Sequence, residues 1–398
     1  MSKEETIRQK MEREYPELGE VRLTAVKDGF SAEVIPSQDE LRRKGILNIA
    51  ETLRCGAISR YNQRCPEGER ILQCRFLPAS GHPRQHRPVP PPQTQEYRLV
   101  TECLERQFGF RSIHPEDHFE LDLGMDSLDK MVFQLSLGKC LGRTVSDVML
   151  VNYPTPLLLS RALQGCAGKG SPGFQPFDWG EFCYHSVMRK ELPFPGCLHY
   201  CTAVVLSLLL RAFFRFQCTG QENIPRGPCV LVANHQSFLD ANCITSVLSR
   251  RQLRETYFYA KSQNPDAPLL RFYCRRHNIV HVNVNQNLAL SIRKLATLLR
   301  WGRKVMIFPE GTRTFDGSLS PFKKTFAILA KEFRAPIVPI AIDGAFRALP
   351  RTQALPVFGT KIAMTILPPI PVQEEDTVDT LVQKTVDAIS SRLQAPCS

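Results

Sequence analysis

The feature that most constrains the fold is an alternation of short apolar runs and amphipathic stretches in the second half of the chain. Between the apolar runs lie helix-like stretches, and residues 288–301 place Leu288, Ile292, Leu295 and Leu299 at helical spacing. This alternation predicts an α/β sheet covered by helices. The expected strands are Cys229–Ala233, Thr256–Ala260, Ile279–Val284, Lys304–Phe308, Ile337–Ile342 and Ile362–Ile366.

Two breaks divide the chain, which at 398 residues and 43% hydrophobic content is long enough for more than one buried core. Residues 85–95 (QHRPVPPPQTQ) hold four prolines, and residues 165–173 (GCAGKGSPG) hold four glycines. We therefore expect a multidomain α/β protein. Its expected parts are an α+β segment in residues 1–84, a linker in 85–95, a helical domain in 96–166, a linker in 167–196 and an α/β domain in 197–398.

The net charge of +12 suggests a partner with negative charge, namely nucleic acid, anionic lipid or an acidic protein. Residues 95–165 carry seven Lys/Arg and ten Asp/Glu, net −3, whereas residues 197–350 carry 21 Lys/Arg and eight Asp/Glu, net +13. The two segments can therefore attract each other. No basic run is interleaved with aromatic residues, so we expect no nucleic-acid partner.

Cysteine usage and the amino-terminal sequence both favour a cytoplasmic location. The fourteen cysteines include no C-x-x-C pair, so we expect reduced thiols and no metal site. The first residues, MSKEETIRQKMERE, lack the apolar core of a signal peptide. The apolar run Cys201–Leu210 has half of the roughly 20 residues that span a bilayer, so no transmembrane helix is expected.

A histidine and an aspartate follow the first expected strand of the α/β domain. His235 comes at the strand exit, and Asp240 lies five positions later in the first turn of an expected helix. The carboxylate can hold one imidazole nitrogen while the other takes a proton. Such a base suits attack of a hydroxyl or an amine on an activated acyl group. The alternative is a capping aspartate beside a surface histidine.

A second motif, F-P-E-G-T-R, follows the expected strand Lys304–Phe308. It supplies Glu310, Gly311, Thr312 and Arg313, in which the glycine permits close backbone approach and the arginine can bind phosphate or carboxylate. The alternative is an ordinary turn with a solvated salt bridge.

The two motifs, in this order, resemble the glycerolipid acyltransferase family, whose members acylate lysophosphatidate and related acceptors. The family blocks N-H-x-x-x-x-D and F-P-E-G-T-R are matched without substitution, and residues 336–340 match a later V-P-I segment. The resemblance covers residues 200–370. It implies that His235 is the general base, that Asp240 orients it, and that residues 310–313 position the polar or phosphate group of the acceptor.

The middle block of that family is not matched. Members that form phosphatidate have a glycine opening a strand that ends in arginine, whereas this chain has Asn278 and Val284 at those places. The segment is more similar to the bacterial bifunctional enzyme that reacylates lysophosphatidylethanolamine. A lysophospholipid or a glycerol-phosphate-type acceptor is therefore expected, and an amine acceptor remains the alternative.

In the acidic segment, Ser127 follows a glycine-containing loop at the start of an expected helix. Unpaired N–H groups and the dipole at a helix N-terminus favour an attached phosphodiester, although Asp126 or Ser127 could simply be an N-cap. An amphipathic stretch with Leu99, Cys103, Leu104 and Phe108 precedes this loop, and a short apolar element follows.

Residues 123–128 (LGMDSL) resemble the L-G-x-D-S-L motif of acyl carrier proteins. The resemblance implies a four-helix bundle in which a phosphopantetheinyl transferase attaches 4′-phosphopantetheine to Ser127. The helix residues Asp126, Asp129 and Lys130 would face a basic docking surface.

Residues 33–78 are similar to the small C-terminal lid of acyl-adenylate-forming ligases. The lid ends with a catalytic lysine, but residues 79–84 (ASGHPR) contain none. The chain also has no nucleotide-binding loop rich in Ser, Thr and Gly. We expect a relic, or a docking piece for a separate acyl-adenylating ligase.

Together these patterns predict an acyltransferase that uses the thioester of its own carrier domain or of acyl-CoA. The alternatives are an N-acyltransferase that makes an N-acyl amino acid or aminolipid, and a non-catalytic carrier scaffold for a separate ligase. Residues 198–216, with Arg211 and Arg215, could lie on the inner face of a membrane as an interfacial helix or pack on the domain's own sheet. The lipid acceptor favours peripheral membrane association.

Overall fold

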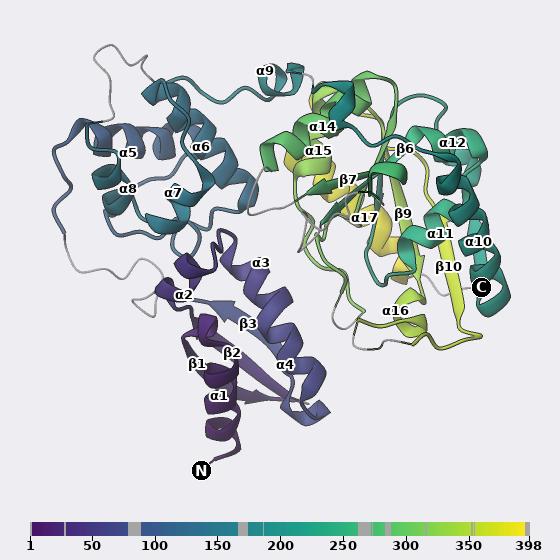
Figure 1. Cartoon of the computed structure of the whole chain (residues 1–398), viewed down its shortest axis with the longest axis horizontal. Coiled ribbons are helices and arrows are strands. Elements are labelled where there is room, and N and C mark those ends of the chain that lie inside the picture. Colours follow the sequence, from purple (N-terminus) through teal and green to yellow (C-terminus); the bar gives the residue numbers. More distant parts are fainter. Residues whose placement is uncertain are drawn as a thin grey trace. The chain divides into compact units, whose positions relative to one another are not determined.

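A computed structural model describes residues 2–27, 29–78, 89–165, 174–185, 187–261, 272, 274–282, 288–314, 317–351, 353 and 355–394. The described residues divide into two compact units, one ending at Phe177 and the other beginning at Asp178 (Figure 1).

The first part of unit 1 is an α+β segment. Strand β2 pairs antiparallel with β1 and parallel with β3. The helices pack on this sheet around buried residues such as Met11, Leu53 and Tyr61. Its elements are α1 (Lys3–Glu14), β1 (Glu20–Val26), β2 (Gly29–Ile35), α2 (Gln38–Arg43), α3 (Ile49–Leu53), α4 (Ser59–Arg64) and β3 (Ile71–Phe76).

The second part of unit 1 is helical, as we expected from the sequence of residues 96–166. Buried side chains from separate helices and from the long loop meet in one core, including Cys103, Phe119 and Phe133. Gly109 and Gly142 end the two long helices in left-handed conformation. The helices are α5 (Gln95–Phe108), α6 (Ser127–Leu141), α7 (Asp147–Asn152) and α8 (Pro156–Ala162).

A buried ion pair joins the two parts of unit 1. The Glu120 carboxylate accepts from the backbone nitrogens of Ile49 at 2.9 Å and Ala50 at 2.8 Å, at the N-terminus of α3. Lys130 pairs with Glu120 and donates to the carbonyl oxygen of Leu47 at 2.6 Å. Because the Lys130 side chain is only 4% exposed, the expectation that it faces a docking partner is wrong.

The second unit is an α/β domain around a sheet with the order β4-β10-β9-β5-β8-β6-β7. Neighbouring strands are parallel except β9 and β10, which are antiparallel. All the expected strands are confirmed, with small shifts at their ends, and the expected end of one at Val284 lies outside the described residues. The strands are β4 (Arg215–Thr219), β5 (Val230–Ala233), β6 (Thr256–Lys261), β7 (Ile279–Val282), β8 (Lys304–Ile307), β9 (Ile337–Asp343) and β10 (Lys361–Ile366).

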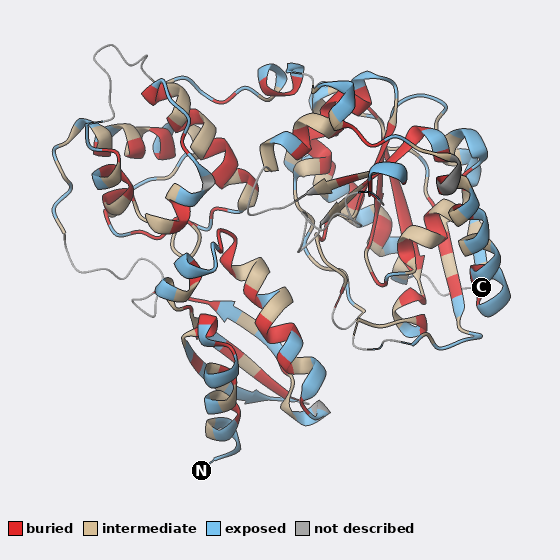
Figure 2. Cartoon of the chain, in the orientation of Figure 1, coloured by how far each residue is buried: buried red, intermediate tan, exposed pale blue. Residues whose placement is uncertain are grey.

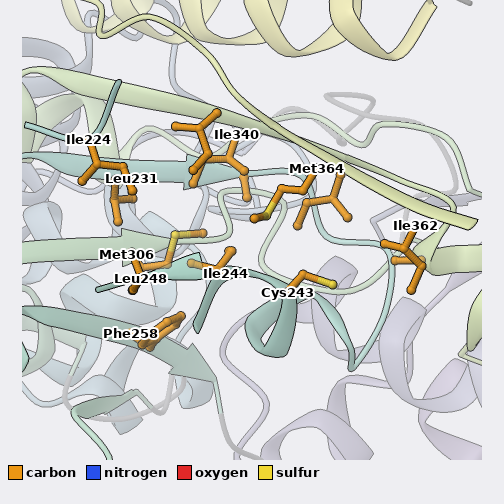
Figure 3. Close-up of a cluster of buried hydrophobic side chains, with 14 of the residues drawn as sticks. Ile224, Leu231, Cys243, Ile244, Leu248, Phe258, Met306, Ile340, Ile362 and Met364 are labelled. Atoms are coloured by element: carbon orange, nitrogen blue, oxygen red, sulfur yellow. The ribbon is translucent and has the colours of Figure 1, made fainter. Parts of the chain in front are cut away.

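Helices cover both faces of this sheet. On one face, Leu231, Met306 and Ile340 from neighbouring strands pack against Cys243 and Ile244 of α11 (Figure 3). Helices α14, α15 and α17 contact strands of the sheet through their own apolar sides. The helices of this unit are α9 (Trp179–Tyr184), α10 (Cys197–Phe213), α11 (Asp240–Val247), α12 (Arg250–Glu255), α14 (Leu288–Arg300), α15 (Thr325–Glu332), α16 (Ala345–Ala348) and α17 (Val378–Gln394).

The helix expected over residues 198–216 is shorter than predicted. Helix α10 ends at Phe213, and Arg215 with Phe216 belongs to β4, because Phe214 turns into the core. Over the described ranges, we find no helix with the length and apolar character needed to cross a membrane.

Candidate active site

The turn between β5 and α11 forms the first wall of the site. Asn234 directly follows β5, and its side chain exchanges two hydrogen bonds with the backbone of Ile342 in the neighbouring β9. Its Nδ2 donates to the carbonyl oxygen and its Oδ1 accepts from the nitrogen, both at 2.8 Å. Because Asn234 is buried and doubly bonded, the chain leaves the sheet in a fixed direction and presents His235 next.

The structure brings His235 and Asp240 into contact. Nδ1 of His235 lies 2.8 Å from Oδ2 of Asp240. An ionised carboxylate can only accept, so Nδ1 carries the proton of the neutral ring and Nε2 keeps a lone pair. The ring also stacks on Phe308, with 4.2 Å between centroids. The imidazole is therefore held at one nitrogen and able to accept a proton at the other.

Asp240, the first residue of α11, is completely buried and is held by the turn that precedes it. Oδ2 also accepts from the backbone nitrogens of Gln236 at 2.6 Å and Ser237 at 2.8 Å. Burial raises the pKa of Asp240, and the bonds from His235 and from these two amides oppose that rise. An aspartate fixed in this way orients the imidazole and can stabilise its protonated form.

The second motif packs against this turn through Glu310. Oε1 of Glu310 accepts from the backbone nitrogen of His235 at 2.6 Å, and Oε2 accepts from the backbone nitrogen of Ser320 at 2.9 Å. The side chain is buried, and burial raises its pKa to about 7. Glu310 thus bonds to the backbone that carries His235, and both of its oxygens are engaged.

The rest of the F-P-E-G-T-R loop is fixed by backbone contacts. Gly311 has a φ of 71°, a left-handed conformation that favours glycine. Its N–H donates to the carbonyl oxygen of Phe308 at 3.1 Å, so this N–H is bonded within the loop. The backbone nitrogen of Thr314 donates to the carbonyl oxygen of His235 at 2.8 Å. The loop and the His235 turn therefore form one hydrogen-bonded structure.

The arginine of this loop lies beside a second cation. The guanidinium carbon of Arg313 is 3.4 Å from the ring centroid of Phe238. Nη1 of Arg351 donates to Oγ1 of Thr312 at 2.8 Å. The pKa of Arg313 is lowered to about 10, first by burial and second by the charge of Arg351. The site is therefore electropositive on the side of Arg313.

The structure describes one of the two positions at which this chain departs from the family's middle block. Asn278 is buried, adopts a φ of 55°, and donates from Nδ2 to the carbonyl oxygen of Thr256 at 3.1 Å, with further contacts to two carbonyl groups of α12. It is thus a structural residue next to β6. Val284 lies outside the described residues.

Ser127 is in unit 1, at the first position of α6. Asp126 is the N-cap, and its Oδ1 accepts from the backbone nitrogens of Leu128 at 2.7 Å and Asp129 at 2.9 Å. The Asp129 side chain accepts from the backbone nitrogen of Asp126 in return. These N–H groups are therefore occupied by the cap, and the half-buried Ser127 is held beside them.

Sequence reasoning missed several residues that build the site. Asn234 and Gln236 were inside the recognised motif but had no assigned role, although Oε1 of Gln236 accepts from the backbone nitrogen of Phe346 at 3.2 Å. Arg351 lies outside both motifs, so no spacing could identify it. In the described part of the chain, no three His, Cys, Asp or Glu side chains gather as a metal site requires.

Comparison with known proteins identifies two families within the chain. Residues 215–343 match the family model described as Acyltransferase, and residues 98–163 match the one described as Phosphopantetheine attachment site. The first match contains the His235 turn and the F-P-E-G-T-R loop, and the second contains Ser127. Both resemblances seen in these segments of the sequence are confirmed.

Two relatives among curated proteins each match less than half of the chain. The 1-acyl-sn-glycerol-3-phosphate acyltransferase BAT2 of Brassica napus, chloroplastic, is 32% identical over 157 residues, which cover 38% of this chain and 44% of the relative. The human 1-acyl-sn-glycerol-3-phosphate acyltransferase beta is 30% identical over 149 residues, covering 36% and 51%. The chain thus spans about half the length of these relatives.

Among solved structures, the crystal structure of the 1-acyl-sn-glycerophosphate acyltransferase PlsC from Thermotoga maritima aligns with a TM-score of 0.41 and 23% identity. The alignment covers 55% of this chain and 96% of that chain.

Proposed function

We propose that this chain, which carries an acyltransferase-family domain in residues 215–343 and a phosphopantetheine attachment domain in residues 98–163, transfers a fatty acyl group from a thioester to a hydroxyl group. The acceptor is a lysophospholipid or a related glycerol phosphate. The observation that supports this proposal most is the 2.8 Å contact between Nδ1 of His235 and Oδ2 of Asp240 at the exit of a central strand.

His235 acts as the general base in this proposal. Its Nε2 accepts the proton of the acceptor hydroxyl as the oxygen attacks the thioester carbonyl, and it then gives that proton to the departing thiolate. The acyl–oxygen bond forms and the acyl–sulfur bond breaks, and the sulfur leaves as a thiol with the proton from the hydroxyl. Asp240 keeps Nδ1 protonated and stabilises the imidazolium that exists between the two proton transfers.

The carrier domain fits covalent attachment at Ser127. Ser127 is the first residue of α6 and is half-buried. When bound there, 4′-phosphopantetheine would supply a thiol that holds the acyl chain as a thioester. Asp126 and Asp129 cap the helix and hold Ser127 in place. The attachment would be made by a phosphopantetheinyl transferase.

The acceptor is proposed from the names of the relatives and from the charge of the site. Both relatives described above are named as acyltransferases of 1-acyl-sn-glycerol 3-phosphate. Arg313, beside the His235 turn, supplies a guanidinium that can pair with phosphate. Thr312 and Gly311 shape the same loop, whereas Glu310 positions His235 through the backbone.

The donor is the chain's own carrier domain or acyl-CoA. A tethered carrier raises the effective concentration of the thioester to the order of millimolar. The net charge of −3 on residues 95–165 and of +13 on residues 197–350 favours their encounter.

We propose three domains, in residues 1–84, 96–166 and 197–398, joined by linkers at 85–95 and 167–196. The first resembles a ligase lid and would serve as a docking piece.

Helix α10 supports peripheral contact with an anionic membrane. Its outward side exposes Val204, Val205, Leu208 and Leu209, whose helix is largely pale blue in Figure 2. The apolar surface continues from Phe213 to Phe358, whose ring centroids are 5.0 Å apart. Exposed cations border it at Arg211, Arg215 and Lys361. Apolar side chains bordered by cations suit a bilayer with anionic headgroups.

The proposal is tested by loading the full chain and identifying its products. The chain is converted to its phosphopantetheine form, acylated, and mixed with lysophospholipids, glycerol 3-phosphate and amino acids, and products are identified by mass. An O-acyl glycerolipid supports the proposal. An N-acyl product supports the amine alternative, and no product with any acceptor or with acyl-CoA supports a carrier scaffold. Ser127→Ala must abolish the mass increase of one phosphopantetheine.

A further inference from the structure

A cluster of exposed cations and aromatic rings lies where the chain leads into α10. Two segments that are distant in sequence, residues 189–194 and 272–276, come together here. The backbone nitrogen of Phe194 donates to the carbonyl oxygen of Arg275 at 2.8 Å, and Nη2 of Arg275 donates to the carbonyl oxygen of Lys190 at 2.9 Å. We call this cluster the basic patch, and it consists of Arg189, Lys190, Phe194, Phe272, Arg275 and Arg276.

The basic patch is open to solvent, and its charge is almost entirely positive. Its four cations are exposed, and Phe194 and Phe272 are 63% and 55% exposed. The guanidinium carbon of Arg276 lies 5.1 Å from the ring centroid of Phe272. The two segments contain a single carboxylate, Glu191, and within the described residues no salt bridge neutralises the four cations. Exposed aromatic rings beside unpaired cations indicate a binding surface for an anionic partner.

The basic patch adjoins the exposed apolar side of α10. Oγ1 of Thr202 on α10 lies 3.3 Å from Nδ1 of His277, the residue that follows the patch. Positions 202, 205 and 209 share one side of a helix, so Val205 and Leu209 lie on the side of this contact. These two residues are 53% and 45% exposed. The apolar surface of α10 therefore continues onto two aromatic rings that cations surround.

The place of the patch on the sheet decides between two anionic partners. Arg275 and Arg276 precede the amino end of β7, whereas His235 follows the carboxyl end of β5. Because β5, β8, β6 and β7 are parallel, the patch and His235 lie at opposite edges of the sheet. An acidic carrier domain bound there would hold its thioester away from His235. A bilayer that contacts the length of α10, which at 17 residues is about 25 Å long, meets the patch as well.

We infer that the basic patch is a second membrane-contact surface, in which the two phenylalanines enter the interface of an anionic bilayer and the four cations bind its headgroups. This inference rests on the membrane contact proposed for α10 and extends it. The protein lies with α10 along the bilayer and is held at both ends of that helix.

Co-sedimentation of the full chain with vesicles of phosphatidylcholine and phosphatidylserine tests the patch. Arg276→Glu is expected to weaken binding by about tenfold, and added salt should reduce this difference. Phe194→Ala should weaken binding by about threefold to tenfold at every salt concentration, because apolar burial is lost. The matched control is Arg334→Glu, which makes the same change of charge at a side chain that is 78% exposed, and it should bind like wild type. Equal binding by wild type, Arg276→Glu and Phe194→Ala would overturn the inference.

Hydrogen exchange of the vesicle-bound chain separates this inference from the proposed function, since it requires no turnover. Residues 189–196 and 274–277 should exchange more slowly on vesicles, together with α10. Protection of α10 alone would overturn the inference and leave the proposed contact of α10 intact, whereas no binding by wild type would contradict both. Unchanged vesicle binding by Arg276→Glu, with slower transfer from the chain's own carrier than from acyl-CoA, would assign the patch to the acidic carrier and also overturn the inference.

Discussion

Oε1 of Glu310 accepts a hydrogen bond from the backbone nitrogen of His235 at 2.6 Å, so the glutamate of one motif holds the histidine of the other by its main chain. The second oxygen accepts from Ser320. A residue that the sequence places among acceptor ligands therefore has both oxygens bonded within the protein. Its part in the proposed reaction is to position His235.

The first prediction concerns pH and Glu310. Burial raises the pKa of Glu310 to about 7, above the value near 4.3 of an unfolded chain. Between these values the folded state binds more protons than the unfolded state, so the free energy of unfolding falls as pH rises, by up to about 4 kcal/mol. This contribution is present below the unfolded pKa and is lost through pH 7. Glu310→Gln should lack this part of the pH dependence.

Tryptophan fluorescence measures this prediction in the full chain. The two tryptophans, Trp179 and Trp301, both lie in the second unit, so denaturation curves from pH 5 to 8 report on the unit that contains Glu310. The control is Glu374→Gln, whose side chain is 89% exposed. Parallel pH profiles for wild type and Glu310→Gln would contradict the prediction.

The second prediction concerns the charge of Asp240. Asp240→Asn can keep an oxygen at the position of Oδ2, which accepts from His235 and from two amides, but it removes the charge that stabilises an imidazolium. We expect kcat to fall by about 10²- to 10⁴-fold. The new amide nitrogen would occupy the place of Oδ1, which is buried without a hydrogen-bond partner, so a loss of about 1–3 kcal/mol in stability is also expected. Single-turnover assays and denaturation curves separate the two effects. A folded variant with wild-type kcat would exclude the proposed role.

The third prediction concerns the joint within unit 1. Glu120→Gln leaves Lys130 as an unpaired buried cation and should destabilise the joint by about 3–5 kcal/mol. Lys130→Met should be milder, because the Glu120 carboxylate still accepts from the amides of Ile49 and Ala50 at a helix N-terminus. Hydrogen exchange of residues 46–53 and 118–131, followed by mass spectrometry, measures the opening of this joint. Slower exchange in Glu120→Gln than in Lys130→Met would refute this order.

The fourth prediction concerns the membrane surface of α10. Leu208 is 63% exposed, so Leu208→Glu should change stability little and should weaken binding to vesicles with anionic lipid by about tenfold, through lost apolar burial and charge repulsion. Leu72→Glu on β3, where the leucine is 52% exposed, is the matched control and should bind like wild type. Co-sedimentation with vesicles measures both. Equal binding by all three proteins would remove α10 from the proposed surface.

The central strands of the sheet could be predicted because they contain short apolar runs. Every residue of β5 (VLVA) is apolar and buried, and in β8 (KVMI) three buried apolar residues follow the buried Lys304. Strand β4 (Arg215–Thr219) was missed because it is at the sheet edge, exposes Arg215, and follows α10 after a single residue. Its sequence, RFQCT, resembles the end of an amphipathic helix.

The contact between His235 and Asp240 could be predicted from spacing, because a turn of five residues returns the aspartate to the histidine. The bonds of Glu310 could not, since they reach backbone amides, which every residue offers. Arg351 is distant from both motifs in sequence, and only the packing of α16 brings it to Thr312. The burial of Lys130 depends likewise on a contact between two separate parts of unit 1.

The proposed reaction requires His235 as the base that lets an acceptor hydroxyl take the acyl group from the phosphopantetheine arm of Ser127. The most direct measurement is intact mass of the full chain, acylated on the phosphopantetheine arm of Ser127, during a single turnover with 1-acylglycerol 3-phosphate. Wild type should lose the mass of the acyl group and yield the diacyl product, whereas His235→Ala should keep the acyl group while showing wild-type fluorescence and denaturation. Release to the acceptor at the wild-type rate by folded His235→Ala would contradict the claim.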